Sequence, residues 1–120
     1  MDLIYISTEI QKRINDLSNG RKIIAQRSEE KAKYISEYEK KMAVVIMRLK
    51  NGEKFDIEGH TVGGELPANL IEKIARGVCW KEKMDMERAD GFYRAAVSGM
   101  SSLESELNGL QSILRYLKEI

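Results

Sequence analysis

The side chains in this chain that could do acid–base, nucleophilic or metal chemistry are few. The candidates are one histidine, one cysteine and a run of carboxylates: His60, Cys79, Glu82, Asp85, Glu87 and Asp90. The sequence has no GxSxG, P-loop, HExxH or CxxC motif, and one Cys with one His is too few for the usual zinc ligand set. We interpret His60 as a loop residue and the carboxylates as the solvated face of a helix. The sequence therefore predicts no enzyme activity, no metal and no cofactor.

Trp80 is the side chain best suited to bind a partner, because tryptophan is over-represented among binding hot spots. Two interpretations are open. In the first, Trp80 packs into the bend between a short helix and the long helix that follows it, which we call the elbow. In the second, Trp80 is exposed and anchors a partner. If it is an anchor, the predicted partner-binding residues are those expected near the elbow: Phe55, Ile57, His60 and Trp80.

A second set of residues favours nucleic acid. Basic side chains interleaved with tyrosines can follow a phosphate backbone and stack on bases. Arg27, Lys31, Tyr34 and Lys41 have this pattern, with Tyr38 beside them. The alternative is an ordinary solvated helix, whose lysines are offset by the glutamates at 29, 30, 37 and 39.

The elements that position these residues are mostly helical. Apolar residues recur at steps of three and four from Ile10 to Leu49, which predicts a long helix over residues 7–50, capped by Ser7 or Thr8. Ser18-Asn19-Gly20 is its weak point because these residues are mediocre or poor helix formers. The apolar seam keeps its phase across them, so we predict one helix.

Residues 43–57 are ambiguous between helix and hairpin. Val44-Val45-Ile46 is β-branched and Asn51-Gly52 is a strong turn signal. The unbroken seam favours helix, with Gly52 as its C-cap and a small hairpin around Glu58-Gly59 within a 51–65 tip. A short helix then follows over 67–76, begun by Pro67 and ended by a left-handed Gly77.

A second long helix is predicted over 78–120. Beside its apolar seam runs a stripe of small residues, and its candidate self-association positions are Gly91, Ala95, Ser98, Ser102 and Gly109. Glycine inside a helix costs up to ~1 kcal/mol, so the stripe suggests a closely approached surface. Three readings are open: the first helix packs there, the stripe is solvated, or two chains meet there.

Composition agrees with an all-α fold. Charged residues make up 32% of the chain and aromatic residues 7%, with one proline, a balance typical of amphipathic helices rather than sheets. We predict a single domain over 1–120: two long antiparallel helices, a helical hairpin or coiled coil, with a short helix and a small β-hairpin at the tip. The two parts of the chain that contain these helices have opposite charge bias, +4 over residues 1–54 and −3 over 55–120, which suits pairing or a homo-oligomer.

The expected location is the cytoplasm. A single cysteine fits a reducing compartment. The N-terminal residues lack the basic start and long apolar run of a signal peptide, and no apolar run approaches the ~20 residues that span a bilayer.

The second half of the chain resembles small proteins encoded by phages and prophages of Gram-positive bacteria, generally of unassigned function. The similarity covers roughly residues 64–117 and rests on Gly64, Pro67, Leu70-Ile71, Ala75-Arg76-Gly77, Lys83, Ala89-Asp90, Tyr93, Ala96, Leu107, Leu110, Gln111 and Arg115. Family members run almost directly from the first helix into the Gly-x-x-Pro turn, so the Asn51–Gly63 insertion is a departure. The resemblance implies phage origin more than mechanism.

These observations predict a non-catalytic protein that binds a host or phage protein complex. Inhibition of a bacterial defence complex, in the manner of an anti-CRISPR protein, is one concrete form. The alternatives are a nucleic-acid-binding accessory of phage replication or recombination, and a structural coiled-coil element.

Overall fold

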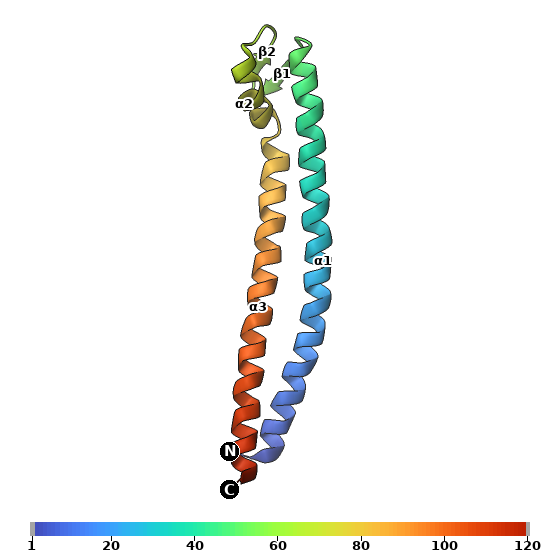
Figure 1. The fold of residues 1–120 in the computed structure, drawn as a ribbon. Coiled ribbons are helices and arrows are strands. Elements are labelled where there is room, and N and C mark those ends of the chain that lie inside the picture. The colour runs from blue at the N-terminus through green and yellow to red at the C-terminus, as the bar shows by residue number, and fades with distance from the viewer. Residues whose placement is uncertain (1, 120) are drawn as a thin grey trace. The chain divides into compact units, whose positions relative to one another are not determined.

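The computed structural model describes residues 2–119 of the chain. The order of elements is α1 (Leu3–Lys50), β1 (Lys54–Ile57), β2 (His60–Gly63), α2 (Ala68–Val78) and α3 (Trp80–Glu119) (Figure 1). Chain contacts divide it into two compact units. Unit 1 takes in the described residues up to Glu29 and from Gly91 on, and unit 2 runs from Glu30 to Asp90. In each unit a stretch of α1 lies antiparallel to a stretch of α3, which confirms the predicted helical hairpin with a short helix and a small β-hairpin.

Helix α1 begins four residues earlier than the sequence suggested. Its first turn is capped by Asp2, whose Oδ1 accepts a hydrogen bond of 3.0 Å from the backbone N–H of Ile4. The predicted cap at Ser7 or Thr8 is therefore wrong. Thr8 lies inside the helix, where its hydroxyl donates to the Ile4 carbonyl. The helix continues without interruption through Ser18-Asn19-Gly20, as predicted.

The end of α1 settles the helix-or-hairpin ambiguity in favour of helix. Gly52 has φ of +81°, its N–H donates to the Leu49 carbonyl, and the Glu53 N–H donates to the Arg48 carbonyl. This pair of bonds is a Schellman motif, in which a left-handed residue satisfies the last carbonyls of a helix. The Asn51-Gly52 turn signal thus ends a helix instead of joining two strands.

The hairpin forms where it was expected. Strands β1 and β2 pair antiparallel, with Phe55 opposite Val62 and Ile57 opposite His60. The two turn residues, Glu58 and Gly59, have φ of +47° and +85°, the signature of a type I′ turn, whose twist suits a two-residue hairpin. At the end of β2, a Cβ on Gly63 would collide with the Glu53 carbonyl oxygen.

Helix α2 differs from prediction at its C-terminal end. Pro67 precedes the helix at the N-cap position with φ of −57° and ψ of 141°, and its carbonyl accepts from the Leu70 N–H. Gly77 does not end the helix in a left-handed conformation, as we had predicted, but lies within it. A Cβ there would lie 3.4 Å from Cδ1 of Ile57 in β1, an ordinary van der Waals distance. Cys79, with φ of −94°, forms the junction to α3.

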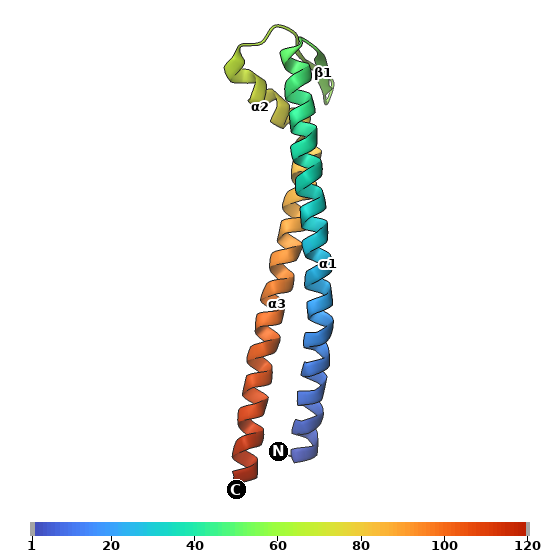
Figure 2. The ribbon, with the colours of Figure 1, turned by 45° about the vertical axis from the view of Figure 1, so that its right-hand side comes forward.

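Unit 2 contains the main core. Val45 and Leu49 of α1, Ala75 of α2 and the junction residue Cys79 are at most 2% exposed and pack together. Partly buried apolar side chains from α1, the hairpin region and α2 surround them: Tyr38, Met42, Ile46, Phe55, Leu66, Ile71, Ile74 and Val78. The hairpin and α2 gather at the C-terminal end of α1 (Figure 2), so the tip is a folded cap.

Unit 1 is thinner. Among its described hydrophobic residues only Ile6 and Leu17 of α1 are buried. When two helices pack only on each other, no third element covers the apolar side chains at the edges of their contact.

Candidate functional site

Trp80 is the most exposed aromatic residue among those described in unit 2. It opens α3, and 49% of its surface is accessible. The residue before it, Cys79, is fully buried in the core, which fixes the backbone that carries the indole. Met84, one turn further along α3, is 44% exposed. Cys79 therefore fills the elbow that the first interpretation assigned to Trp80, and Trp80 with Met84 forms an exposed apolar pair, which we call the tip anchor.

The other residues predicted to bind a partner at the elbow divide into two groups. The ring of Phe55 packs against the unit 2 core, and the guanidinium carbon of Arg48 lies 4.7 Å from the ring centroid. Ile57 is half-buried and its Cδ1 faces Gly77. Only His60 remains exposed. Phe55 and Ile57 of the hairpin thus stabilise the fold. Of the predicted hairpin residues, His60 is the one that a partner could contact.

A partly exposed ion pair joins α1 to α3 close to the junction. Lys41 Nζ of α1 donates to Oε1 of Glu82 in α3 at 2.6 Å. Burial raises the pKa of Glu82, but the hydrogen bond and the charge of Lys41 outweigh it and hold the pKa below its ordinary value. Burial also raises the pKa of the Cys79 thiol, opposed by Lys41. The thiol is therefore protonated at neutral pH, in keeping with a structural role.

The residues proposed for nucleic acid have partners inside the fold. Lys31 Nζ lies 3.0 Å from the Asp90 carboxylate, Lys41 is paired with Glu82, and the Arg27 guanidinium lies 5.2 Å from the centroid of the Phe92 ring. Tyr34 is half-buried, with Lys33 Nζ 5.5 Å from its ring centroid. The positive charge on this side of α1 is thus largely offset by α3, which weakens its attraction for phosphates.

Unit 1 holds a feature that the sequence did not reveal, an apolar groove between α1 and α3 with a volume of about 470 Å³. Its lining comes from both helices: Asp16, Asn19, Gly20, Ile23, Ala96, Gly99, Met100 and Leu103. We call it the unit 1 groove. Its lining is small at Gly20 and Gly99, and Ile23 at its edge is 47% exposed.

Gly20 makes the closest contact in this groove. A Cβ built on Gly20 would lie 2.5 Å from Sδ of Met100, which is closer than two such atoms approach in practice. The Met100 side chain would therefore have to shift before any side chain could fit at position 20. The glycine that looked like a weak point of the helix is where α3 packs against it.

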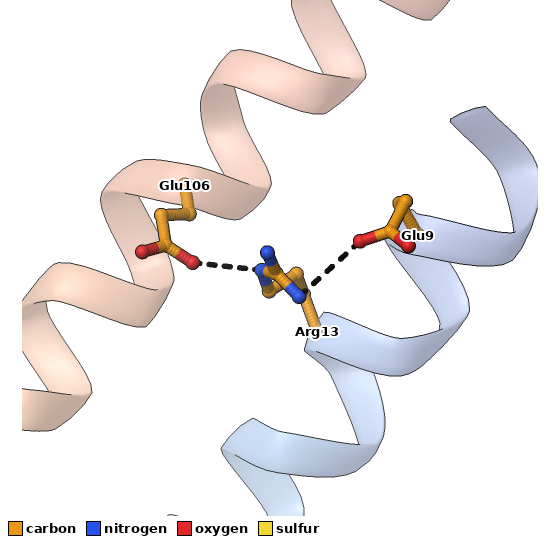
Figure 3. Close-up of polar contacts among 3 residues, drawn as sticks. All are labelled: Glu9, Arg13 and Glu106. Carbon is orange, nitrogen blue, oxygen red and sulfur yellow. Dashed lines mark hydrogen bonds and ion pairs between the residues drawn. The ribbon is translucent and has the colours of Figure 1, made fainter. Parts of the chain in front are cut away.

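Contacts of charged side chains lie beyond each end of the groove, along the same faces of α1 and α3. Toward the N-terminal end of α1, Arg13 Nε donates to Glu106 Oε2 at 2.7 Å, and Arg13 also pairs with Glu9 of its own helix at 3.4 Å (Figure 3). Toward the other end lies the stacked pair of Arg27 and Phe92. These contacts therefore link α1 to α3 at both ends of the groove.

The predicted small-residue stripe on α3 lies on the surface. Gly91, Ala95, Ser98, Ser102 and Gly109 are all exposed, and a Cβ on Gly91 or Gly109 would meet no atom within 4 Å. The reading in which α1 packs on the stripe is therefore wrong. Solvent and a second chain remain the two readings.

Within residues 2–119, no group of three or more His, Cys, Asp or Glu side chains could hold a metal ion, and no helix is long and apolar enough to cross a bilayer. Comparison with protein families, curated proteins and solved structures finds no match to this chain. The resemblance to phage-encoded proteins therefore remains a prediction, and function has to be argued from the surfaces described above.

Proposed function

We propose that this protein acts by binding a protein partner, without catalysis, and that the tip anchor is the centre of the contact. The observation that carries the proposal is that Trp80 is half exposed while the adjacent Cys79 is fully buried. An aromatic side chain on a fixed backbone loses little conformational entropy on binding, and tryptophan is enriched among binding hot spots.

The resemblance of residues 64–117 to phage and prophage proteins supports a partner in a bacterial host. Our specific proposal is a component of a bacterial defence complex, which the protein would inhibit in the cytoplasm by occupying a working surface, as anti-CRISPR proteins do. Nucleic acid is the weaker candidate, since Lys31 and Lys41 are already paired with carboxylates.

The test is affinity capture from the lysate of a phage-permissive Gram-positive host, with and without nuclease. Partners would be identified by mass spectrometry and then produced for direct binding. We expect a stoichiometric protein that survives nuclease and binds the purified chain. Trp80→Ala should weaken that binding by at least about tenfold, since hot-spot residues contribute about 2 kcal/mol or more.

Tyr116→Ala is the matched control, because Tyr116 is an exposed aromatic residue of unit 1, at 65%. It should leave the affinity unchanged, and both variants should keep the helical circular-dichroism signal. Normal binding by Trp80→Ala would exclude the tip anchor. Recovery that is lost with nuclease, together with affinity that falls steeply with salt, would favour the nucleic-acid alternative.

A further inference from the structure

We infer that the unit 1 groove is the interface for a second copy of this chain, whose own unit 1 packs on it to complete a four-helix bundle. In a two-fold arrangement the same patch is used by both copies, so Ile23 of each copy would enter the groove of the other. This inference is independent of the tip anchor, which lies in unit 2.

The surface area of the chain supports this. Its solvent-accessible surface is 8573 Å², whereas a folded monomer of 13.7 kDa is expected to expose roughly 6,600 Å². The excess, about 2,000 Å² by this comparison, falls within the range that each chain of an obligate homodimer buries, roughly 1,000–2,500 Å². Burying that area against a second copy would bring the exposed surface of each chain to the value expected of a monomer of its mass.

Unit 1 is the part of the chain with the smaller core of its own. Apart from Ile6 and Leu17 it lacks buried hydrophobic residues among those described, while Ile23, Phe92 and Val97 are 47%, 49% and 42% exposed. A two-helix layer has too little core to be stable alone, and natural bundles close such a layer with further helices.

The charge pattern points to a copy of the same chain. Residues 95–103 of α3, which include the groove residues Ala96, Gly99, Met100 and Leu103, contain no charged side chain. Surfaces depleted of charge are typical of the cores of interfaces. Residues 91–120 have three basic and three acidic side chains, and residues 1–29 have five and four. Two such units carry almost no net charge and would not repel each other.

The test is sedimentation equilibrium of the full chain over a wide concentration range, paired with thermal unfolding at several concentrations. We expect a monomer–dimer equilibrium and a Tm that rises with concentration. Ile23→Glu places a charge in the groove and should raise the dimer dissociation constant by at least about tenfold.

Ile14→Glu is the matched control. Ile14 has the same side chain on the same helix with a similar exposure, 43%, and nine residues of separation place it on the opposite face of α1. This variant should dimerise normally. Gly99→Leu provides a second route, because it fills the groove while improving helix propensity, and it should also lose the dimer.

Three outcomes would overturn the inference: a wild-type chain that is monomeric at every concentration, a Gly99→Leu variant that still dimerises, or equal loss from Ile14→Glu and Ile23→Glu. The first would leave the groove to a different protein. Trp80→Ala should not change the dimer, so failure here and failure of the tip anchor can be told apart.

Discussion

At Gly20, one contact is expected to reverse the usual effect of a glycine-to-alanine substitution on stability. In a helix interior, replacing glycine by alanine normally stabilises the protein by up to ~1 kcal/mol. At Gly20 the new Cβ would meet Sδ and Cγ of Met100 at 2.5 and 3.3 Å. We predict that Gly20→Ala fails to stabilise the chain or destabilises it, whereas Gly109→Ala, with no atom within 4 Å, raises the free energy of unfolding by about 0.5–1 kcal/mol.

Urea unfolding of the two single variants measures this difference. A double-mutant cycle identifies its cause: in a Met100→Ala background, Gly20→Ala should become stabilising, because the clash is gone. Equal effects of Gly20→Ala in both backgrounds would contradict the assigned contact.

The Lys41–Glu82 pair predicts a pH dependence. Because the pKa of Glu82 is lower in the folded state than its ordinary value near 4.5, the pair contributes stability at pH values above 4.5 and loses that contribution as the pH falls through the lowered folded pKa. Lys41→Met should therefore destabilise the protein at pH 7, by about 0.5–1 kcal/mol for a partly exposed pair. The gap between wild type and variant should close as the pH falls toward 2.

Arg76→Met is the control, because Arg76 pairs with Glu72 on the exposed surface of α2, where the two side chains are 61% and 63% exposed. Its effect should be small at every pH. Urea unfolding at a series of pH values makes the comparison, and a Lys41→Met difference that stays constant with pH would show that the charge on Glu82 is not involved.

Among the elements, the β-hairpin is the one whose turn is least well matched by its sequence. A type I′ turn needs φ above zero at both central residues, yet the first of them is Glu58, at +47°. Asparagine tolerates this conformation better than glutamate. We predict that Glu58→Asn stabilises the hairpin by about 0.5–1 kcal/mol, measured by urea unfolding, while Gly59→Ala destabilises it. Destabilisation by Glu58→Asn would argue against the turn assignment.

The end of α1 gives a companion prediction. Gly52→Ala should destabilise the protein by about 1 kcal/mol or more, because alanine is strained at φ of +81°. Gly91→Ala serves as the control, since Gly91 lies within α3, and should be neutral or stabilising. Thermal unfolding of both variants decides the matter. A neutral Gly52→Ala would mean that the helix end can be rebuilt without the left-handed residue.

Much at the scale of elements could be predicted from the sequence. The seam from Ile10 to Leu49 gave the helix, and the Glu58-Gly59 turn gave the hairpin, because both signals are local. The cap at Asp2 was missed since three potential capping residues lie close together at this end of the chain. Gly77 was misread because a glycine near a helix end usually terminates it, whereas α2 continues through Gly77 to Val78.

The candidate surfaces were harder to predict. The exposure of Trp80 depends on which residue fills the core, and the sequence could not decide between Cys79 and Trp80. The unit 1 groove depends on the register between α1 and α3, which brings Gly20 opposite Met100. The available sequence signals were a glycine in phase with the apolar seam and the uncharged residues 95–103. Neither specifies register by itself.

At the scale of the whole molecule, the two units should differ in stability. Unit 2 has a core built from α1, α2 and the junction, whereas only two hydrophobic residues are buried in the described part of unit 1. We predict that at low protein concentration the backbone amides of α1 before Glu29 exchange hydrogen faster than those near Val45. Hydrogen-exchange mass spectrometry checks this, and equal protection in the two units would contradict it.

The adjacent Cys79 and Trp80 give unit 2 its own spectroscopic reporters. The chain has one tryptophan and one cysteine, both at the same junction, and the thiol is fully buried. Tryptophan emission and the rate of thiol alkylation therefore report on opening of unit 2 alone, whereas far-ultraviolet circular dichroism follows the helices of both units. If the dichroism falls before the emission shifts and before the thiol reacts, unit 1 melts first. The order of events can thus be read from the natural chain, without any label.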